Sequence, residues 1–262
     1  MKKIALFLFV FPFLTCHANA QAITNKKGQN ILPEAGNWAV GIDVVPVFKY
    51  AGNLFYNSSD STSDFSPYYP LTVFGKYVTK PHTATRVQAR LGFNTGSNDT
   101  LVPKAGSTNP NELVSNQAKR TQTNILLAAG IEKRKGTTRV TGIYGVEGAF
   151  LLKTDKTKYT YGNDLDVTIQ SNSQLISDKS GTQFGFGIRG FLGVEYFIAP
   201  KLSLTAEYGW GPSVVSTGRG SQEFEVVDGN TTKTQITETS KSFNFGFDND
   251  INGGTIALVF YF

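Results

Sequence analysis

Ten ionisable side chains interrupt stretches of this sequence in which apolar and small residues otherwise alternate. Carboxylates brought together with guanidinium or ammonium groups away from water form ion pairs and charge-assisted hydrogen bonds. The set holds equal numbers of acids and bases, so a shared interior would carry no net charge and would favour mutual pairing. We expect a charge network made of Asp43, Lys76, Arg86, Arg90, Glu132, Arg139, Glu147, Arg189, Glu195 and Glu207.

Two ion pairs within this set follow from position alone. Glu147 and Arg189 lie at similar distances from the short turns of two predicted strands, and Glu132 and Arg139 flank one turn. Side chains opposite each other on paired strands are close enough to interact. Glu147 and Glu195 are also of the type that forms the acid pair of a glycoside hydrolase. A balanced set of charges favours ion pairing over that chemistry.

Few other residues offer nucleophilic or acid–base chemistry. The chain has one cysteine, Cys16, and two histidines, of which His82 follows Pro81 in a predicted tight turn. Histidine is the usual general base or triad partner in hydrolysis and acyl transfer. We therefore expect no catalytic residues and no cofactor.

One segment resembles the start of a calcium-binding loop. Asp248-Asn249-Asp250-Ile251-Asn252-Gly253 has the required acids and glycine, but Val259 stands where the loop needs its twelfth-place glutamate. We predict no metal site. Gly253-Gly254 is predicted to hold a β-bulge instead, because the apolar residues on its two sides have opposite parity.

The first twenty residues predict a cleaved secretory signal. Lys2 and Lys3 precede an apolar stretch that ends at Leu14, and Ala18-Asn19-Ala20 is a small-residue cleavage site. A lipoprotein, lipidated at Cys16, is the alternative. Residues 21–37 are then a short periplasmic N-terminal segment before the main domain, residues 38–262, and both termini are expected in the periplasm. No run of 18 apolar residues occurs, which excludes a membrane-spanning helix.

The main domain alternates apolar with polar or small residues, which is the pattern of β-strands. In residues 85–94, for example, Val87, Leu91 and Phe93 alternate with Arg86 and Arg90. This pattern occurs in eight segments in total. The predicted strands are residues 38–49, 69–79, 85–94, 121–132, 139–152, 184–196, 202–210 and 255–262.

The connections between these strands alternate in length. Those after the second, fourth and sixth strands are tight: 80–82, 133–136 and 199–200. Those after the first, third, fifth and seventh are long and polar: 51–68, 95–119, 153–182 and 213–252. Short turns at one end and long loops at the other are typical of outer-membrane barrels. We predict an all-β, eight-stranded antiparallel up-and-down transmembrane β-barrel with short periplasmic turns and long extracellular loops.

The two faces of the strands favour lipid on the outside. Only helices and closed barrels satisfy every backbone amide within a bilayer, and in small membrane barrels the apolar face points outward. Here the opposite face carries the charges, so a filled lumen is expected. A lipocalin-like periplasmic ligand-binding barrel is the alternative with inward apolar faces. Aromatic residues toward the strand ends suit an interfacial girdle: Tyr50, Tyr68, Tyr69, Tyr77, Phe93, Phe150, Tyr196 and Phe262.

The last strand adds a specific signal. Ile256, Leu258, Phe260 and the terminal Phe262 alternate in a pattern that closely resembles the C-terminal signal read by the outer-membrane assembly machinery. From about residue 38 onward, the chain resembles the small outer-membrane β-barrel family, which includes the OmpA barrel domain and OmpX. This resemblance implies insertion into the outer membrane of a Gram-negative bacterium. The implied partners are membrane lipid, lipopolysaccharide and the assembly machinery.

The loops carry the remaining functional signal. Residues 224–236 predict a hairpin around Asp228-Gly229, and strands prolonged beyond the membrane would offer sheet edges to a partner strand. We expect a non-catalytic, monomeric structural or adhesin-like protein. The net charge of +5 is not gathered as a nucleic-acid patch. The alternatives are a small low-conductance pore, a lipid-modifying enzyme, and a ten-stranded barrel that includes the hairpin.

Overall fold

The computed structural model describes residues 23–44, 72–109, 111–166, 173–247 and 253–262, which form an all-β fold. In that part of the chain, no helix is long and apolar enough to cross a membrane. The strands are β1 (Trp38–Asp43), β2 (Thr72–Lys80), β3 (Thr83–Pro103), β4 (Leu113–Lys135), β5 (Val140–Thr160), β6 (Ser173–Lys179), β7 (Gln183–Ala199), β8 (Leu202–Trp210), β9 (Pro212–Thr217), β10 (Ser221–Asp228), β11 (Thr231–Glu238), β12 (Ser242–Phe247) and β13 (Gly253–Tyr261).

Eight of these strands close into a barrel. The ring runs β1–β2–β3–β4–β5–β7–β8–β13, every pair is antiparallel, and β13 pairs back onto β1 with Ala39 opposite Tyr261. The eight-stranded antiparallel barrel is thus confirmed. The hairpin of β10 and β11 pairs with β6 outside the ring, so the ten-stranded alternative is wrong.

The short turns gather at one end of the barrel, which we call the turn end. Pro81-His82 joins β2 to β3, and Pro200-Lys201 joins β7 to β8, as expected. β4 continues to Lys135, so the third turn lies at 136–139, later than predicted. Trp38 and Phe262 exchange backbone hydrogen bonds of 3.1 and 2.9 Å, so the two ends of the barrel strands meet at the turn end.

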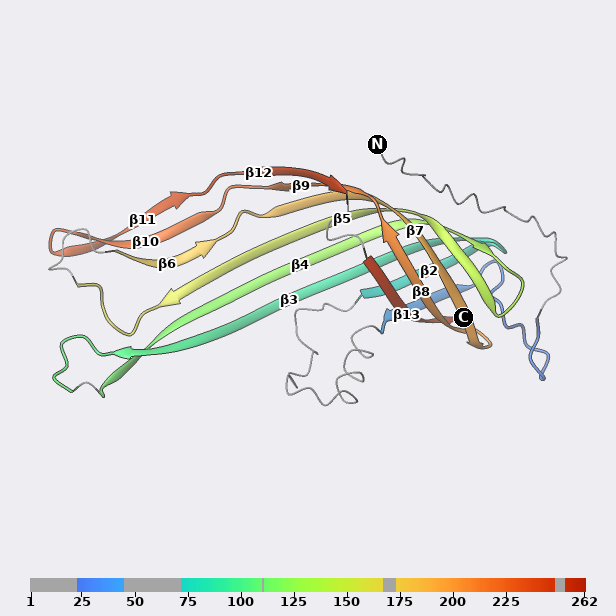
Figure 1. Cartoon of the computed structure of the whole chain (residues 1–262), viewed down its shortest axis with the longest axis horizontal. Coiled ribbons are helices and arrows are strands. Elements are labelled where there is room, and N and C mark those ends of the chain that lie inside the picture. Colours follow the sequence, from blue (N-terminus) through green and yellow to red (C-terminus); the bar gives the residue numbers. More distant parts are fainter. Residues whose placement is uncertain (1–22, 45–71, 110, 167–172, 248–252) are drawn as a thin grey trace, which may run out of the picture.

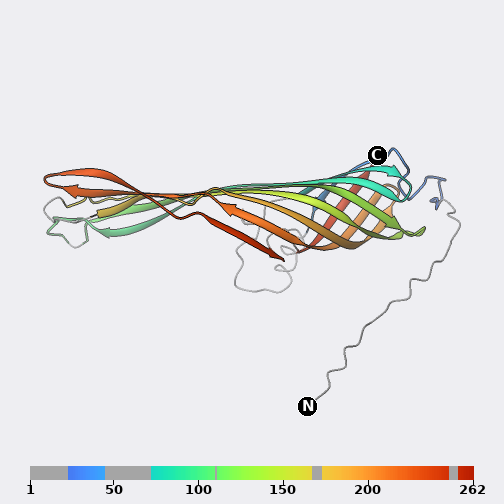
Figure 2. The ribbon, with the colours of Figure 1, turned by 90° about the horizontal axis from the view of Figure 1, so that it is seen from above.

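At the opposite end the sheet continues far beyond the barrel (Figures 1 and 2). β3, β4 and β5 stay paired over 21–23 residues each, and β6, β10 and β11 extend the sheet alongside them. We call this part the extension. The predicted loops 95–119, 153–182 and 213–252 are therefore wrong as loops, because much of each is strand. The predicted loop 51–68 lies outside the described residues.

The prediction failed there because a strand in water needs no apolar face. Residues of the extension are rich in Thr, Ser, Asn and Gln, and they lack the alternation that marks a half-buried strand. Long uninterrupted pairing holds them instead, as between β3 and β4, where one register runs from Thr83 opposite Lys133 to Pro103 opposite Leu113. The predicted hairpin is confirmed: Gly229, with φ of 65°, begins its two-residue turn.

The predicted change of parity before the last strand is present, but at a different place. Across the junction of β8 and β9 the register with β7 is continuous, with Gly190 opposite Trp210 and Gly187 opposite Ser213. Phe247 pairs with Pro212, and Gly253 pairs with Gly209. Phe247 and Gly253 are six residues apart, whereas their partners Pro212 and Gly209 are three residues apart, so the outward face changes from odd-numbered to even-numbered residues. β13 keeps one register with β8 through Gly253 and Gly254, so the predicted bulge at Gly253-Gly254 is wrong. Residues 248–252, between β12 and β13, lie outside the described residues.

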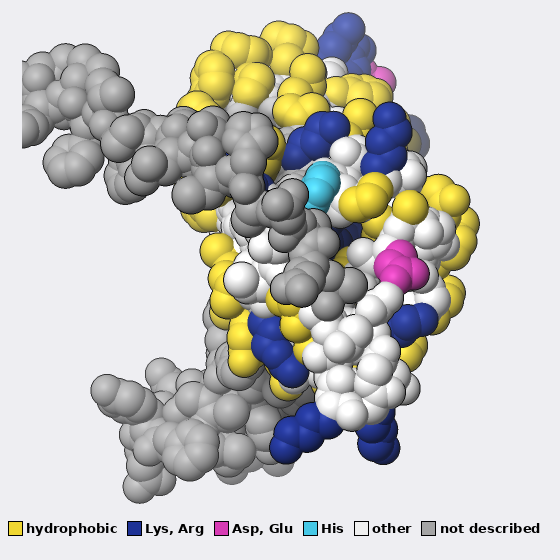
Figure 3. Space-filling view, turned by 90° about the vertical axis from the view of Figure 1, so that its right-hand side faces the viewer, with side chains coloured by type: hydrophobic (Ala, Val, Ile, Leu, Met, Phe, Trp, Pro, Cys, Tyr) yellow, Lys and Arg dark blue, Asp and Glu magenta, His cyan; other side chains and the backbone are white. Residues whose placement is uncertain are grey.

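The barrel exposes apolar side chains on its outer surface and buries charged side chains in its interior. Large apolar side chains point outward on every strand of the ring, and Figure 3 shows them around the sides of the barrel with Lys and Arg near the turn end. Inside, a buried apolar cluster includes Phe74, Val78, Phe197 and Tyr261. Ile31, from the segment before β1, joins this cluster and is 1% exposed.

Candidate functional site

Arg86 lies at the centre of a buried network of charged side chains inside the barrel, which we call the ion network. Its guanidinium donates two hydrogen bonds to Glu207, of 2.7 and 2.9 Å. Its Nε lies 3.2 Å from Glu147 Oε2, and its Nη1 lies 3.6 Å from Glu132 Oε2. A two-pronged arginine–carboxylate contact is among the strongest protein hydrogen-bond arrangements. Arg86 is 1% exposed, so water does not screen these contacts.

Glu147 and Arg189 face each other across β5 and β7, as the sequence predicted. They occupy directly opposed positions, and Arg189 Nη1 lies 2.7 Å from Glu147 Oε1. Gln88 Nε2 donates a second hydrogen bond, of 2.6 Å, to the same oxygen. Gly209 makes room for this arrangement, because a Cβ atom there would lie 1.8 Å from Arg189 Nε.

A second group of buried polar side chains surrounds Glu195. Arg134 Nη2 lies 2.5 Å from Glu195 Oε2, and Arg134 Nη1 donates a 2.7 Å hydrogen bond to the Tyr261 hydroxyl. Tyr261 and Ser203 donate hydrogen bonds of 2.8 and 2.6 Å to the other carboxylate oxygen of Glu195. Both oxygens of this carboxylate are therefore bonded to neighbours within the barrel.

Glu132 joins the two groups. Lys76 Nζ lies 2.9 Å from Glu132 Oε2, and Arg134 Nη1 lies 3.7 Å from Glu132 Oε1. The connected network contains four acids and four bases, so its formal charges cancel. Its ionic members are Lys76, Arg86, Arg134, Arg189, Glu132, Glu147, Glu195 and Glu207.

Three of the ten charges singled out in the sequence lie elsewhere. Asp43 and Arg90 are only half-buried, and Arg90 Nε donates a 2.8 Å hydrogen bond to Thr72 Oγ1. The predicted pair of Glu132 with Arg139 is wrong. Arg139 Nη1 instead donates hydrogen bonds of 3.1 and 3.0 Å to the carbonyl oxygens of Phe197 and Ile198, at the end of β7.

Arg134 is the network member that sequence reasoning missed. The predicted strand ended at Glu132, which placed Arg134 in a turn, whereas β4 continues to Lys135. A signal was present: Arg134 and Glu132 are two residues apart, so they lie on the same face of a strand. The prediction failed because three cations in succession, 133–135, indicate a solvated turn.

The network favours packing over catalysis. Its acids and bases are 7% exposed or less, and Arg86 also lies 4.1 Å from the centre of the Phe191 ring. A substrate would have to displace these contacts to reach any carboxylate. His82 is exposed in the turn between β2 and β3. Among the described residues, no group of three His, Cys, Asp or Glu side chains is placed to hold a metal ion. Most of the calcium-loop resemblance, 248–252, lies outside them.

The outer surface of the barrel carries a continuous apolar band. On β7 alone, Phe186, Ile188 and Leu192 are 59%, 61% and 70% exposed. The C-terminal pattern belongs to this band: Leu258, Phe260 and Phe262 are exposed, while the intervening Val259 and Tyr261 point into the barrel and are buried. Ile256, on the same face as Leu258, is partly exposed.

The extension ends in an edge strand with accessible side chains on both faces. All eight residues of β11 are exposed, and β11 pairs only with β10 among the described strands. Lys233 and Asp228 form an exposed ion pair near the tip. An edge of this kind presents backbone donors and acceptors to a partner strand.

No family model matches the chain, and no curated protein matches it significantly.

Proposed function

We propose that this chain is an integral outer-membrane β-barrel protein of a Gram-negative bacterium, with the turn end in the periplasm. The observation that supports it is the reversal of the usual soluble pattern. Charged side chains such as Arg86 and Glu195 are buried, while Leu192 and Phe186 are exposed on the outer wall. Large exposed apolar surfaces mark contact with a partner or a membrane. A lipid bilayer accounts for a band that encircles a closed barrel.

Aromatic pairs near both rims of the band support the same proposal. Trp38 and Tyr77 have ring centres 4.6 Å apart near the turn end, and Trp210 and Phe247 have ring centres 6.2 Å apart at the other rim. Trp and Tyr are favoured at the two membrane–water interfaces. On this view residues 1–20 are removed on export, and the exposed residues of β13 are those that the assembly machinery reads.

The proposed role is structural or adhesive, without catalysis. The filled interior favours this role over a pore, because the ion network and the cluster around Ile31 occupy the lumen. The barrel strands would contact lipopolysaccharide, and the extension would project beyond them from the cell surface. The edge of β11 would bind an extended segment of an extracellular partner.

Gel mobility of the isolated outer-membrane fraction tests the barrel and its location. A closed membrane barrel resists SDS, so we expect one mobility without heating and another after boiling. A protein that is absent from this fraction, or soluble without detergent, would contradict the proposal and favour the lipocalin-like alternative.

Surface labelling tests the orientation. The only cysteine of the chain is Cys16, within the proposed signal, so an introduced cysteine is the only thiol of the mature protein. Thr234→Cys in β11 should react with a membrane-impermeant maleimide on intact cells. The matched variant Thr137→Cys, at the turn end, should react only after the outer membrane is permeabilised. The reverse pattern would show that the extension points inward.

A further inference from the structure

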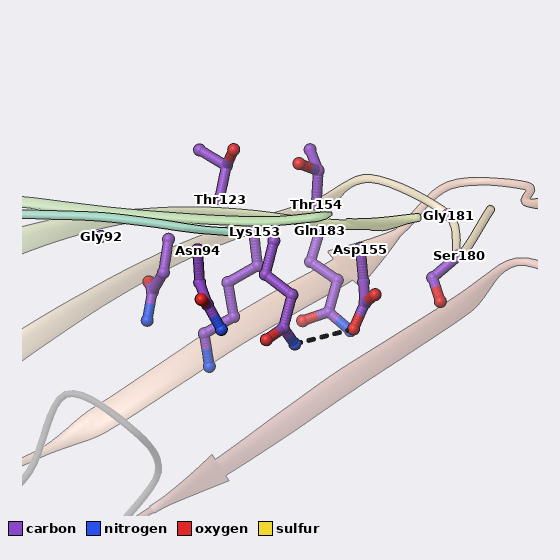
Figure 4. Close-up of a pocket in the computed structure, with 11 residues that line it drawn as sticks. Gly92, Asn94, Thr123, Lys153, Thr154, Asp155, Ser180, Gly181 and Gln183 are labelled. Carbon is purple, nitrogen blue, oxygen red and sulfur yellow. Dashed lines mark hydrogen bonds between the residues drawn. The ribbon is translucent and has the colours of Figure 1, made fainter. Parts of the chain in front are cut away.

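A polar groove lies on the inner face of the sheet, where the barrel passes into the extension (Figure 4). Its volume is about 330 Å³, near the small end of the range for small-molecule sites. Two neighbouring cross-strand rows build it. Asn94, Gln122 and Asp155 form one row across β3, β4 and β5, and Asn124, Lys153 and Gln183 form the next across β4, β5 and β7.

Four carboxamide side chains dominate the groove. Each carboxamide offers two donors and an acceptor, which is the combination that vicinal hydroxyl groups can satisfy. Asn124 Oδ1 is buried and has no hydrogen-bond partner among the described residues. Within the same part of the chain, no hydrogen bond engages the Asn94 or Gln183 side chains. Buried polar groups are nearly always paired in folded proteins, which makes Asn124 Oδ1 the notable acceptor of the groove. Asn94 and Gln183 are half-buried, so their donors and acceptors are accessible to a ligand.

The ionisable side chains of the groove already have partners, which disfavours an ionic ligand. Arg120 Nε lies 3.0 Å from both carboxylate oxygens of Asp155, and Gln122 Nε2 donates a 2.9 Å hydrogen bond to one of them. The Arg120 guanidinium is therefore already bound to a carboxylate and does not bind a phosphate. Lys153 is the other ionisable residue of the lining, and it also has a partner.

The groove has an apolar floor on β4 and β5. Leu126 and Leu151, one cross-strand row deeper, are 6% exposed and pack with Ala128 and Ala149 as a buried apolar cluster. On β3 the same row contains the half-buried Arg90, which lies opposite Leu126. A molecule in the groove would therefore rest on apolar side chains of β4 and β5, beside Arg90.

We propose that this groove binds a neutral saccharide. The donors and acceptors of Asn94, Asn124 and Gln183 would hold its hydroxyls, and the Oε1 atom of Gln122 would accept a further hydrogen bond. The groove has this chemistry wherever the barrel is located. The inference therefore goes beyond the proposed function and can be tested on the purified full chain in detergent.

The first experiment applies the folded protein to a printed array of neutral, sialylated and sulfated glycans. The strongest binder is then measured as a free oligosaccharide by saturation-transfer NMR and titration calorimetry. We expect neutral glycans to bind and the double variant Asn94→Leu/Asn124→Leu to lower the affinity at least tenfold, because two sets of hydrogen bonds are lost. The single variant Gln183→Leu should act in the same direction.

The control variants lie on the same strands. Thr123 and Thr154 also belong to the lining, but their side chains project from the opposite face of the sheet (Figure 4), so Thr123→Val/Thr154→Val should leave binding unchanged. Heat-dependent gel mobility shows whether each variant folds, and Gln183→Leu replaces the double variant if that fails. Binding of no glycan, binding of acidic glycans alone, or equal losses in the groove and control variants would each overturn the inference.

Discussion

Glu147 receives contacts from three directions, and this determines the effect of removing it. Its carboxylate contacts Arg86, Arg189 and Gln88 inside the barrel. Removal of one partner from a buried ion pair leaves an uncompensated charge. We expect Glu147→Ala to lower the free energy of unfolding by about 3–5 kcal/mol, measured by urea unfolding in lipid vesicles. Glu147→Leu/Arg189→Leu should cost less than Glu147→Ala alone.

The same variant separates a filled barrel from a pore. If the network gates a conducting path, planar-bilayer recordings of Glu147→Ala would show a higher conductance than the natural chain. We expect no such increase, because the apolar cluster of Leu126 and Leu151 and the cluster around Ile31 lie on either side of the network.

Arg134 and Arg139 provide a matched comparison at the same scale. Arg134 is buried against Glu195 and Tyr261, whereas Arg139 donates to two backbone carbonyls near the surface. We expect Arg134→Ala to cost about 3–5 kcal/mol and Arg139→Ala about 1 kcal/mol in the same unfolding assay. Equal losses would contradict the assignment of Arg134 to the network.

At the scale of elements, the sequence predicts the barrel strands better than the extension. Alternation identified all eight strands of the ring, because each must present one apolar face and one polar or small face. The extension has no such requirement, and Lys119 or Thr157 can be exposed or half-buried on it without cost. The groove was missed for a related reason. Parity placed Asn94 and Asn124 on the inner face, but only the pairing of β3 with β4, and of β4 with β5, brings the groove residues together.

The extension contains an acid-sensitive contact between β4 and β5. The hydrogen bonds from Arg120 lower the pKa of Asp155, and Gln122 acts in the same direction. A carboxyl with a lowered folded-state pKa stabilises the folded state above its unfolded pKa of about 4, and this contribution is lost as the pH falls through the folded value. Amide hydrogen exchange around Asp155 should therefore show reduced protection below about pH 4, after correction for the intrinsic exchange rate.

Asp155→Asn is the control for this dependence. Its protection should already be lower at neutral pH and should change little on acidification. An acid response as large as in the natural chain would assign the effect to another group.

At the scale of the whole molecule, the outward band determines how substitutions act. Leu192 is 70% exposed in the middle of the band, and Ile198 is 48% exposed near the turn end. In a bilayer, Leu192→Arg should cost about 2–4 kcal/mol and Ile198→Arg about 0–1 kcal/mol, measured by urea unfolding in vesicles. In a soluble barrel, both changes would fall within about 0.5 kcal/mol of zero.

The most direct test of the membrane barrel uses its two tryptophans. Trp38 and Trp210 are 57% and 56% exposed near opposite rims of the band. The protein is reconstituted in vesicles of phospholipid brominated at a shallow or a deep position of the acyl chain, and Trp38→Phe and Trp210→Phe isolate each signal. We expect both tryptophans to be quenched, more strongly by the shallow bromines. Fluorescence unaffected by either lipid but quenched by aqueous acrylamide would place the band in water and contradict a membrane barrel.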